Sequence, residues 1–246
     1  MTNELFLLWQ TPNNNKWLPI AKLLYDAKKY IFKYTIGAEW ARKNENFIAF
    51  TQMTDLKEIY KSDELFPLFK NRLLPKTRPE YQKYLNWLDL DENNYSYFEE
   101  LSRTGGSKAT DSFRILQIPE NHNGKYEVSF FINGIRYLTS NSIDRIDRLE
   151  KNRSLYLMKD IQNKFDSSAL VLRTDDPAEI VGYCPAFFVD DFNKLIDINH
   201  AENVKLSVVK VNYQAPLQFR LLCKLSTLWP SDFISFDQEA FQTIIN

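Results

Sequence analysis

The sequence predicts an α+β protein, in which a small sheet-plus-helices region comes first and a β-barrel-type domain with short covering helices follows. Before about residue 103, a few strand-like runs are followed by segments with helical spacing. Beyond about residue 111 the pattern becomes rich in short strands, with only brief helical interruptions. The hydrophobic share of 44% in 246 residues is sufficient for one large domain or two small ones.

The N-terminal region opens with a small sheet. Residues 4–9 form an apolar run, and residues 17–25 and 30–34 combine aromatic and branched side chains, which favour strands. The run Asn13-Asn14-Asn15 supplies a turn between the first two of them.

Helical spacing follows this sheet. Tyr81, Tyr84, Leu85 and Leu88 stand at i, i+3, i+4 and i+7, which places them on one helix face. The predicted helices cover residues 36–43, 62–69 and 78–88, with one or two further helical turns at 96–101. Ser62 and Thr77 precede two of these helices and are candidate N-caps.

Adjacent glycines then interrupt the periodicity, in the run Arg103-Thr104-Gly105-Gly106-Ser107-Lys108. Such a run forms either a flexible linker or a turn that cradles a phosphate. We favour the linker, because the run lacks both the P-loop spacing and an apolar strand directly before it. The predicted division is an α+β region at 1–103, a linker at 104–111, a β-domain at 112–230 and a C-terminal tail at 231–246, which either docks as a helix or frays.

The second region contains the strand-rich part of the chain. The predicted strands are 113–118, 126–132, 154–158, 169–173, 180–183, 204–211 and 219–225. Two short helices are predicted at 142–150 and 189–196, so a compact barrel or curved sheet with helical covers follows.

The charge balance restricts the partners of this chain. Its 31 basic and 32 acidic residues provide no overall positive field, so any binding to nucleic acid must depend on a local surface. No run approaches the roughly 18 apolar residues that a membrane span needs, and the N-terminus does not resemble a signal peptide. We therefore expect a cytoplasmic protein without a membrane partner.

Catalytic and metal-binding patterns are not evident in the sequence. Cys184 and Cys223 form no CxxC pair and are expected to be buried thiols. His122 and His200 are expected to be exposed or to lie in loops, so no metal-binding pattern results. The acidic pairs Asp175-Asp176 and Asp190-Asp191 fit a turn and a helix start. We expect no catalytic residues, no metal site, no cofactor and no enzymatic activity.

Three motifs in the C-terminal half occur in a distinctive order. They are Gly134-Ile135-Arg136-Tyr137, Asn163-Lys164-Phe165-Asp166 and Val181-Gly182-Tyr183-Cys184-Pro185. In this order, residues from about 126 to 229 resemble the HIRAN domain, a small β-barrel-like module found attached to DNA-remodelling helicases and in many bacterial proteins. The resemblance implies recognition of single-stranded DNA, in particular of a free 3′ end.

The resemblance also implies roles for individual residues. Arg136 would contact a backbone phosphate, Tyr137 and Phe165 would stack on bases, and Asp166 would accept a hydrogen bond from the terminal 3′-hydroxyl. Asn163, Lys164 and Tyr183 complete the candidate interface. Ala186 stands where members of the family commonly have a basic residue, so one phosphate contact of the family is not supplied here.

Each of these residues also has a purely structural interpretation. Tyr137 and Phe165 would then be core rings at strand ends, and Arg136 would pair with an acid. Asn163 and Asp166 would close a turn through bonds from side chain to backbone.

The first region resembles a different family, the small N-terminal subdomain of HipA-type toxin kinases, through residues 5–9, Phe32-Lys33-Tyr34 and the run from Glu64 to Leu73. That subdomain contacts the kinase core and partner proteins, and no kinase body follows here. We therefore predict a non-catalytic module that binds single-stranded DNA or a free 3′ end and recruits a protein partner through residues 1–103. The alternative is a protein-interaction or antitoxin-like regulator of a kinase or effector without direct nucleic-acid binding.

Overall fold

The computed structural model describes residues 4–13 and 15–245, which form two compact units. The first unit runs to Asn86 and adds Leu90–Ile118 and the chain from Ile234 onward. The second unit comprises Trp87–Asp89 and Pro119–Phe233. Both combine sheet and helix, so the predicted α+β class is confirmed. Within the described residues, no helix has the length and apolar character needed to cross a bilayer.

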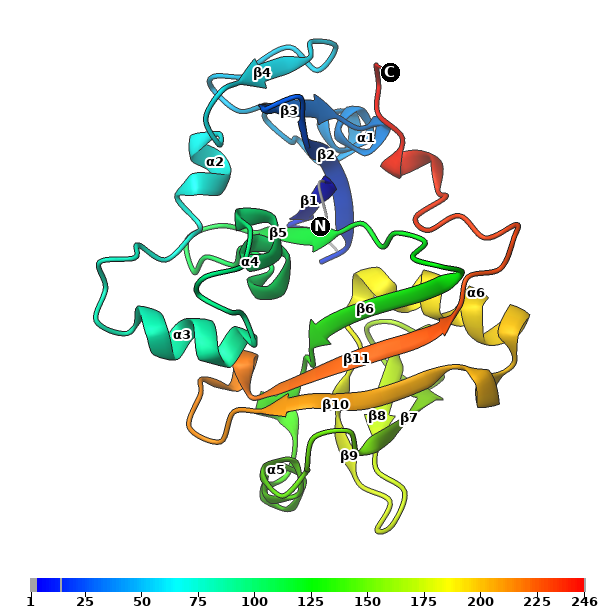
Figure 1. The fold of residues 1–246 in the computed structure, drawn as a ribbon. Helices are drawn as coiled ribbons and strands as arrows, with labels where there is room; N and C mark the ends of the chain where they lie inside the picture. Colours follow the sequence, from blue (N-terminus) through cyan, green and yellow to red (C-terminus); the bar gives the residue numbers. More distant parts are fainter. Residues whose placement is uncertain (1–3, 14, 246) are drawn as a thin grey trace. The chain divides into compact units, whose positions relative to one another are not determined.

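The first unit is built on a five-stranded sheet with the order β4-β3-β2-β1-β5 (Figure 1). The pairings between neighbouring strands are antiparallel. The strands are β1 Glu4–Gln10, β2 Trp17–Asp26, β3 Lys29–Tyr34, β4 Tyr60–Ser62 and β5 Phe113–Gln117. The strands expected at 4–9, 17–25 and 30–34 are therefore confirmed, while Asn14 of the predicted turn lies outside the described residues.

The helices of this part of the chain are α1 Ile36–Asn44, α2 Pro67–Lys70, α3 Tyr81–Leu88 and α4 Tyr97–Thr104. The helix predicted at 62–69 is wrong over most of its length, because Ser62 ends β4 and Pro67 occupies the first turn of a short α2. The predicted caps are also wrong, since Ser62 instead accepts a bond from the Glu64 amide and α3 begins well after Thr77. At α4, Ser96 and Glu99 form a capping box.

The predicted linker at 104–111 differs from the observed division, because it lies inside the first unit. Gly105 is the left-handed C-cap of α4, at φ 67°, and its carbonyl accepts a hydrogen bond of 2.7 Å from the Ile115 amide. The Arg72 guanidinium donates to the Gly106 carbonyl at 2.6 Å and to both carboxylate oxygens of Asp111. The glycine pair is thus an ordered connection to β5, and the division between the units follows Ile118.

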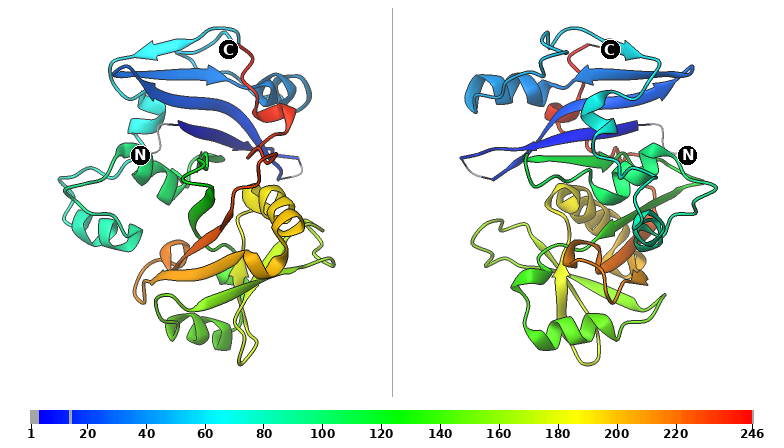
Figure 2. Two further views of the ribbon diagram at one scale, coloured as in Figure 1. Left: turned by 45° about the vertical axis from the view of Figure 1, so that its right-hand side comes forward. Right: turned by 90° about the vertical axis from the view of Figure 1, so that its left-hand side faces the viewer.

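The C-terminal segment also belongs to the first unit, so neither a docking helix nor a frayed tail describes it. Thr243 forms a bridge with Thr35, and the Ile36 amide donates to the Gln242 carbonyl at 2.8 Å. Phe236 and Phe241, the latter in the 3₁₀ turn η5 Glu239–Phe241, pack on Phe6 with ring-centroid distances of 5.8 and 4.9 Å. In Figure 2 this segment, drawn in red, lies beside α1.

The second unit contains a six-stranded antiparallel sheet with the order β6-β11-β10-β7-β8-β9 (Figure 1). A bridge between Asn133, just after β6, and Tyr183, at the end of β9, links its two edges. The sheet therefore curls into a barrel-like form. The strands are β6 Lys125–Phe131, β7 Ser154–Lys159, β8 Leu170–Arg173, β9 Ile180–Tyr183, β10 Lys205–Val211 and β11 Leu221–Leu228.

Helices accompany this sheet, and two of them lie where short helices are predicted, at 142–150 and 189–196. They are α5 Ser140–Asp147 and α6 Val189–Asn199, with the short 3₁₀ turns η1 Ile135–Tyr137, η2 Ala186–Phe188, η3 Ala201–Asn203 and η4 Leu217–Phe219. Phe188 and Phe192 lie 5.9 and 5.7 Å from the Phe130 ring, measured between centroids, and Tyr126 is fully buried next to Phe192. Large rings therefore join the α6 cover to the sheet.

Candidate nucleic-acid interface

The first motif forms a tight turn after β6. Gly134 has φ +79°, and a Cβ atom at this position would lie 2.9 Å from Cδ2 of Tyr183, so only glycine fits. The following turn, η1, presents Tyr137 with 74% of its surface exposed. Arg136 lies over the Tyr137 ring, with its Cζ 4.6 Å from the centroid, and donates to the Tyr137 hydroxyl. An exposed cation and an exposed ring thus share one turn.

The second motif shapes the loop between β7 and β8. The side-chain oxygen of Asn163 accepts hydrogen bonds from the amides of Phe165 (3.0 Å) and Asp166 (3.1 Å), which is an Asx turn. Asp166 Oδ1 accepts from the Ser168 amide at 2.9 Å. This turn holds the Phe165 ring in solvent, with 97% of its surface exposed.

Tyr183 of the third motif links the other two. Its ring packs against Gly134, and its backbone pairs with Asn133. Its hydroxyl donates to Asp160 Oδ2 at 3.1 Å, and the same oxygen accepts from the Asn163 side chain at 3.0 Å. Burial, together with the hydrogen bond to the Asp160 carboxylate, raises the pKa of Tyr183 above its ordinary value. The three motifs therefore meet in one place of the second unit.

This geometry decides between the interpretations of the individual residues. Tyr137 and Phe165 are exposed, so the interpretation as core rings is wrong. Arg136 pairs with Tyr137, and among the described residues no acid pairs with it. Asn163 and Asp166 do close a turn, which leaves Asp166 Oδ2 without a hydrogen bond within the described part of the chain. Lys164 is exposed at the tip of the same loop.

Two residues of this place were not predicted from the sequence. Asp160 joins the loop to Tyr183, and its spacing of three residues from Asn163 is the only local signal for it. Ile161, with 75% of its surface exposed, is a second apolar side chain on the loop. Tyr183 was expected as a contact residue, and in the structure its ring and hydroxyl hold the two turns together.

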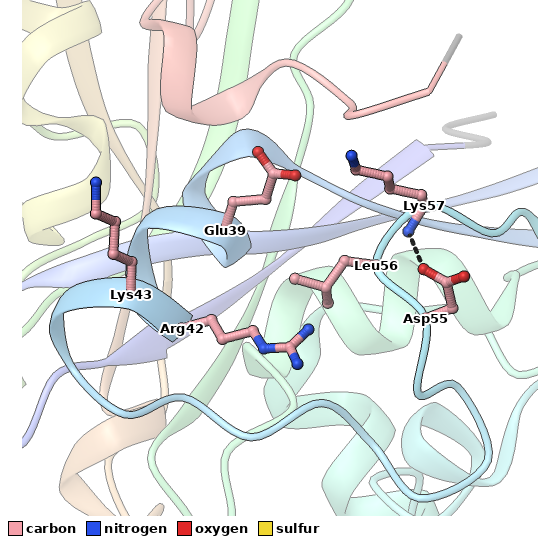
Figure 3. A pocket seen from close by; sticks show the side chains of 6 residues that line it. All are labelled: Glu39, Arg42, Lys43, Asp55, Leu56 and Lys57. Atoms are coloured by element: carbon pink, nitrogen blue, oxygen red, sulfur yellow. Dashed lines mark hydrogen bonds between the residues drawn. The ribbon is translucent and has the colours of Figure 1, made fainter.

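Other places in the chain offer less defined chemistry. Figure 3 shows an open pocket in the first unit that contains both acidic and basic side chains. It is lined by Glu39, Arg42, Lys43, Asp55, Leu56 and Lys57. Among the described residues, no group of three or more His, Cys, Asp and Glu is arranged to hold a metal ion.

The two cysteines are buried thiols, as expected, and neither is in a disulfide. Burial raises the pKa of both thiols, which disfavours the reactive thiolate. Both histidines are exposed, and Asp190 and Asp191 lie in the first turn of α6, which confirms these expectations as well.

No family model matches this chain, and neither does any curated protein. Among solved structures, a protein from Lactobacillus plantarum, a structural genomics target, is similar at 19% identity and a TM-score of 0.32, over 44% of this chain and 100% of that one. The HIRAN domain of human HLTF is similar at 16% identity and a TM-score of 0.31, over 45% of this chain and 84% of that one. Neither is described as a HipA-type kinase, so that resemblance of the first region stays a prediction.

Proposed function

We propose that the second unit is a non-catalytic module that binds single-stranded DNA, with its 3′ end at the loop between β7 and β8. The observation that supports this most is the pair of exposed rings, Tyr137 at 74% and Phe165 at 97%, on two turns that Tyr183 joins. A fully exposed Phe gains nothing for folding, since it removes no apolar surface from water. Held on an ordered turn, it is ready to stack on a base.

The charges around the rings suit one strand of nucleic acid. Arg136 and Lys164 are exposed cations beside Tyr137 and Phe165, and each can neutralise a phosphate. With a formal net charge of −1, the chain has no general attraction for a duplex. Binding would therefore depend on stacking with a small number of phosphate contacts. The first region would recruit a protein partner, as its resemblance to the HipA N-terminal subdomain implies.

Replacing Phe165 by alanine is expected to weaken binding of the full chain to single-stranded oligonucleotides by about five- to 150-fold. The reason is that one stacked base contributes about 1–3 kcal/mol, and every 1.4 kcal/mol is tenfold. Fluorescence anisotropy with a labelled oligonucleotide measures this. Ile161→Ala is the matched control, because it removes an exposed aliphatic side chain from the same loop and leaves the ring.

Equal dissociation constants for wild type and Phe165→Ala would contradict stacking at this ring. If the wild-type chain binds no oligonucleotide at all, the exposed rings instead belong to a protein-interaction surface. The near-neutral charge of the chain is the observation that favours this second function.

We further expect the affinity for an oligonucleotide with a free 3′-hydroxyl to be about ten times or more the affinity for the same oligonucleotide with a 3′-phosphate. Asp166 Oδ2 has an open acceptor position for the hydroxyl, whereas a phosphate would place like charges together. At 4 Å this repulsion costs about 1 kcal/mol in water and about 4 kcal/mol at an effective dielectric constant of 20. Matched oligonucleotides ending in hydroxyl or phosphate measure the difference.

The Asp166→Asn variant tests the role of the carboxylate. An amide oxygen still accepts from the Ser168 amide and from a hydroxyl, while the repulsion of a phosphate is removed, so the two dissociation constants should approach each other. Thermal unfolding of the variant checks that the turn is intact. A wild-type chain that binds both ends equally would show that Asp166 only closes the turn.

A further inference from the structure

The outer face of the β7–β8–β9 sheet continues from the candidate interface. Tyr183 pairs with Val171, which pairs with Met158, so these three side chains lie in one row across the sheet. The inner face of β7 and β8 is marked by the buried Leu155 and Leu172, so the row with Tyr183 is on the opposite, outer face. Met158 is 44% exposed there, and Val171 between its neighbours is buried.

The next row on the same face contains a second aromatic and cationic pair. Tyr156 and Arg173 are direct cross-strand partners, two residues further along β7 and β8. The Arg173 guanidinium lies over the Tyr156 ring, with Cζ 5.1 Å from the centroid. Tyr156 is 43% exposed, and Ile180, the partner of Arg173 on β9, is 38% exposed.

This pair has the same composition as the turn at Arg136 and Tyr137. In both, a guanidinium lies over an exposed tyrosine ring, at 4.6 Å in the turn and 5.1 Å on the sheet. Arg173 also donates to the Thr174 carbonyl at 2.9 Å, which fixes its direction. The described residues contain no acid paired with Arg173, so its charge is available to a phosphate.

We propose that Tyr156 and Arg173 form a second nucleotide-binding position, which takes the part of a single strand that lies 5′ of the terminal bases. This rests on the proposed function of the loop and of Tyr137. The strand would run from the 3′ end at the loop, past Tyr183, to the outer face of β7 and β8. There Tyr156 stacks on a base and Arg173 contacts the adjoining phosphate. Tyr183 and Tyr156 therefore stand in neighbouring rows of one face, where successive bases of a flexible strand can reach them.

Oligonucleotides of two lengths distinguish this second position from the first. The full chain is titrated by fluorescence anisotropy with a trinucleotide, chosen to fill the loop site, and with a decanucleotide, chosen to continue onto the sheet. Tyr156→Ala is expected to weaken decanucleotide binding by about five- to 150-fold and to leave trinucleotide binding unchanged. Tyr156→Phe keeps the ring face and should keep the wild-type affinity. Arg173→Ala should lower the salt dependence of decanucleotide binding by about one counterion.

The variants also separate failure of this inference from failure of the proposed function. Phe165→Ala weakens binding at both lengths if the loop site exists. If it does so while Tyr156→Ala leaves both affinities at the wild-type value, the second position is overturned and the loop site remains. If the wild-type chain binds neither oligonucleotide, both proposals are overturned. Tyr97→Ala, at a tyrosine of the first unit with 44% exposure, is the matched control and should change neither affinity.

Discussion

A chain that ends at Phe233 is expected to lose at least about 3–5 kcal/mol of stability in its first unit, although that unit contains none of the candidate interface. The removed segment includes Phe236, which is 6% exposed, and Phe241, and both pack on the Phe6 ring. Loss of one buried Phe side chain costs about 3–5 kcal/mol, and this truncation removes the edge contacts with Thr35 and Ile36 as well. Hydrogen exchange should therefore become faster in β1–β3.

Hydrogen exchange in the second unit serves as the internal control for this experiment. Protection of β10 and β11, in the second unit, should remain at the level of the intact chain. Phe236→Ala should reproduce most of the loss without shortening the chain. Ile234→Ala, which changes a side chain of the same segment that is 68% exposed, should stay within about 0.5 kcal/mol of wild type. Unchanged exchange in β1–β3 after truncation would show that the C-terminal segment does not stabilise the first unit.

The sequence predicts local elements of this fold better than it predicts their partners. The run from Leu5 to Leu8 is continuously apolar, and the four side chains are buried, which is typical of a strand covered on both faces. One cover is the core that contains Phe32 and Phe69. The other includes residues more than two hundred positions later, and no periodicity in the sequence relates Phe236 or Phe241 to Phe6.

In the candidate interface too, features set by neighbouring residues could be predicted from the sequence, and features set by residues far along the chain could not. The turn at Asn163 depends on residues within a few positions, so its motif predicts it. The need for glycine at position 134 comes in part from the Tyr183 ring, which lies far along the sequence. The exposure of Phe165 does not follow from its type, because a Phe beside a strand is more often buried. The link from Tyr183 to Asp160 joins positions 23 residues apart, and it depends on the register of β7 with β8 and of β8 with β9.

At the glycine pair, the prediction that the helix ends is correct, but the predicted boundary between the two units is wrong. Gly105 and Gly106 do end the helical periodicity, both with positive φ. Their carbonyl groups, however, accept bonds from Ile115 and from Arg72, a residue more than thirty positions earlier. A linker has few such contacts, whereas this segment is fixed by a guanidinium that the sequence pattern does not connect to it.

Replacing Arg72 by alanine is accordingly expected to lower the free energy of unfolding of the first unit by about 3–5 kcal/mol. Its side chain is 2% exposed, and it forms two bonds with Asp111, at 2.6 and 3.2 Å. It also donates to the carbonyls of Gly106 and Leu68 and lies over the Phe113 ring. Its removal takes this donor from two carbonyl groups and from the Asp111 carboxylate, which keeps the hydrogen bond from the Phe113 amide. Breaking a buried pair in this way costs about 3–5 kcal/mol.

Denaturant unfolding measures the effect of Arg72→Ala on stability. Hydrogen exchange then shows whether the loss falls on β1, β5 and the 104–111 segment. The matched control is Lys70→Ala, which removes a neighbouring cation from an ion pair with Glu64 whose side chains are 62% and 81% exposed. An exposed pair of this kind contributes at most about 1 kcal/mol, so the control should stay close to wild type. Asp111→Asn should fall between the two, because the amide oxygen still accepts from the guanidinium. If Arg72→Ala were no more destabilising than Lys70→Ala, the 104–111 segment would be a linker that Arg72 does not fix in place.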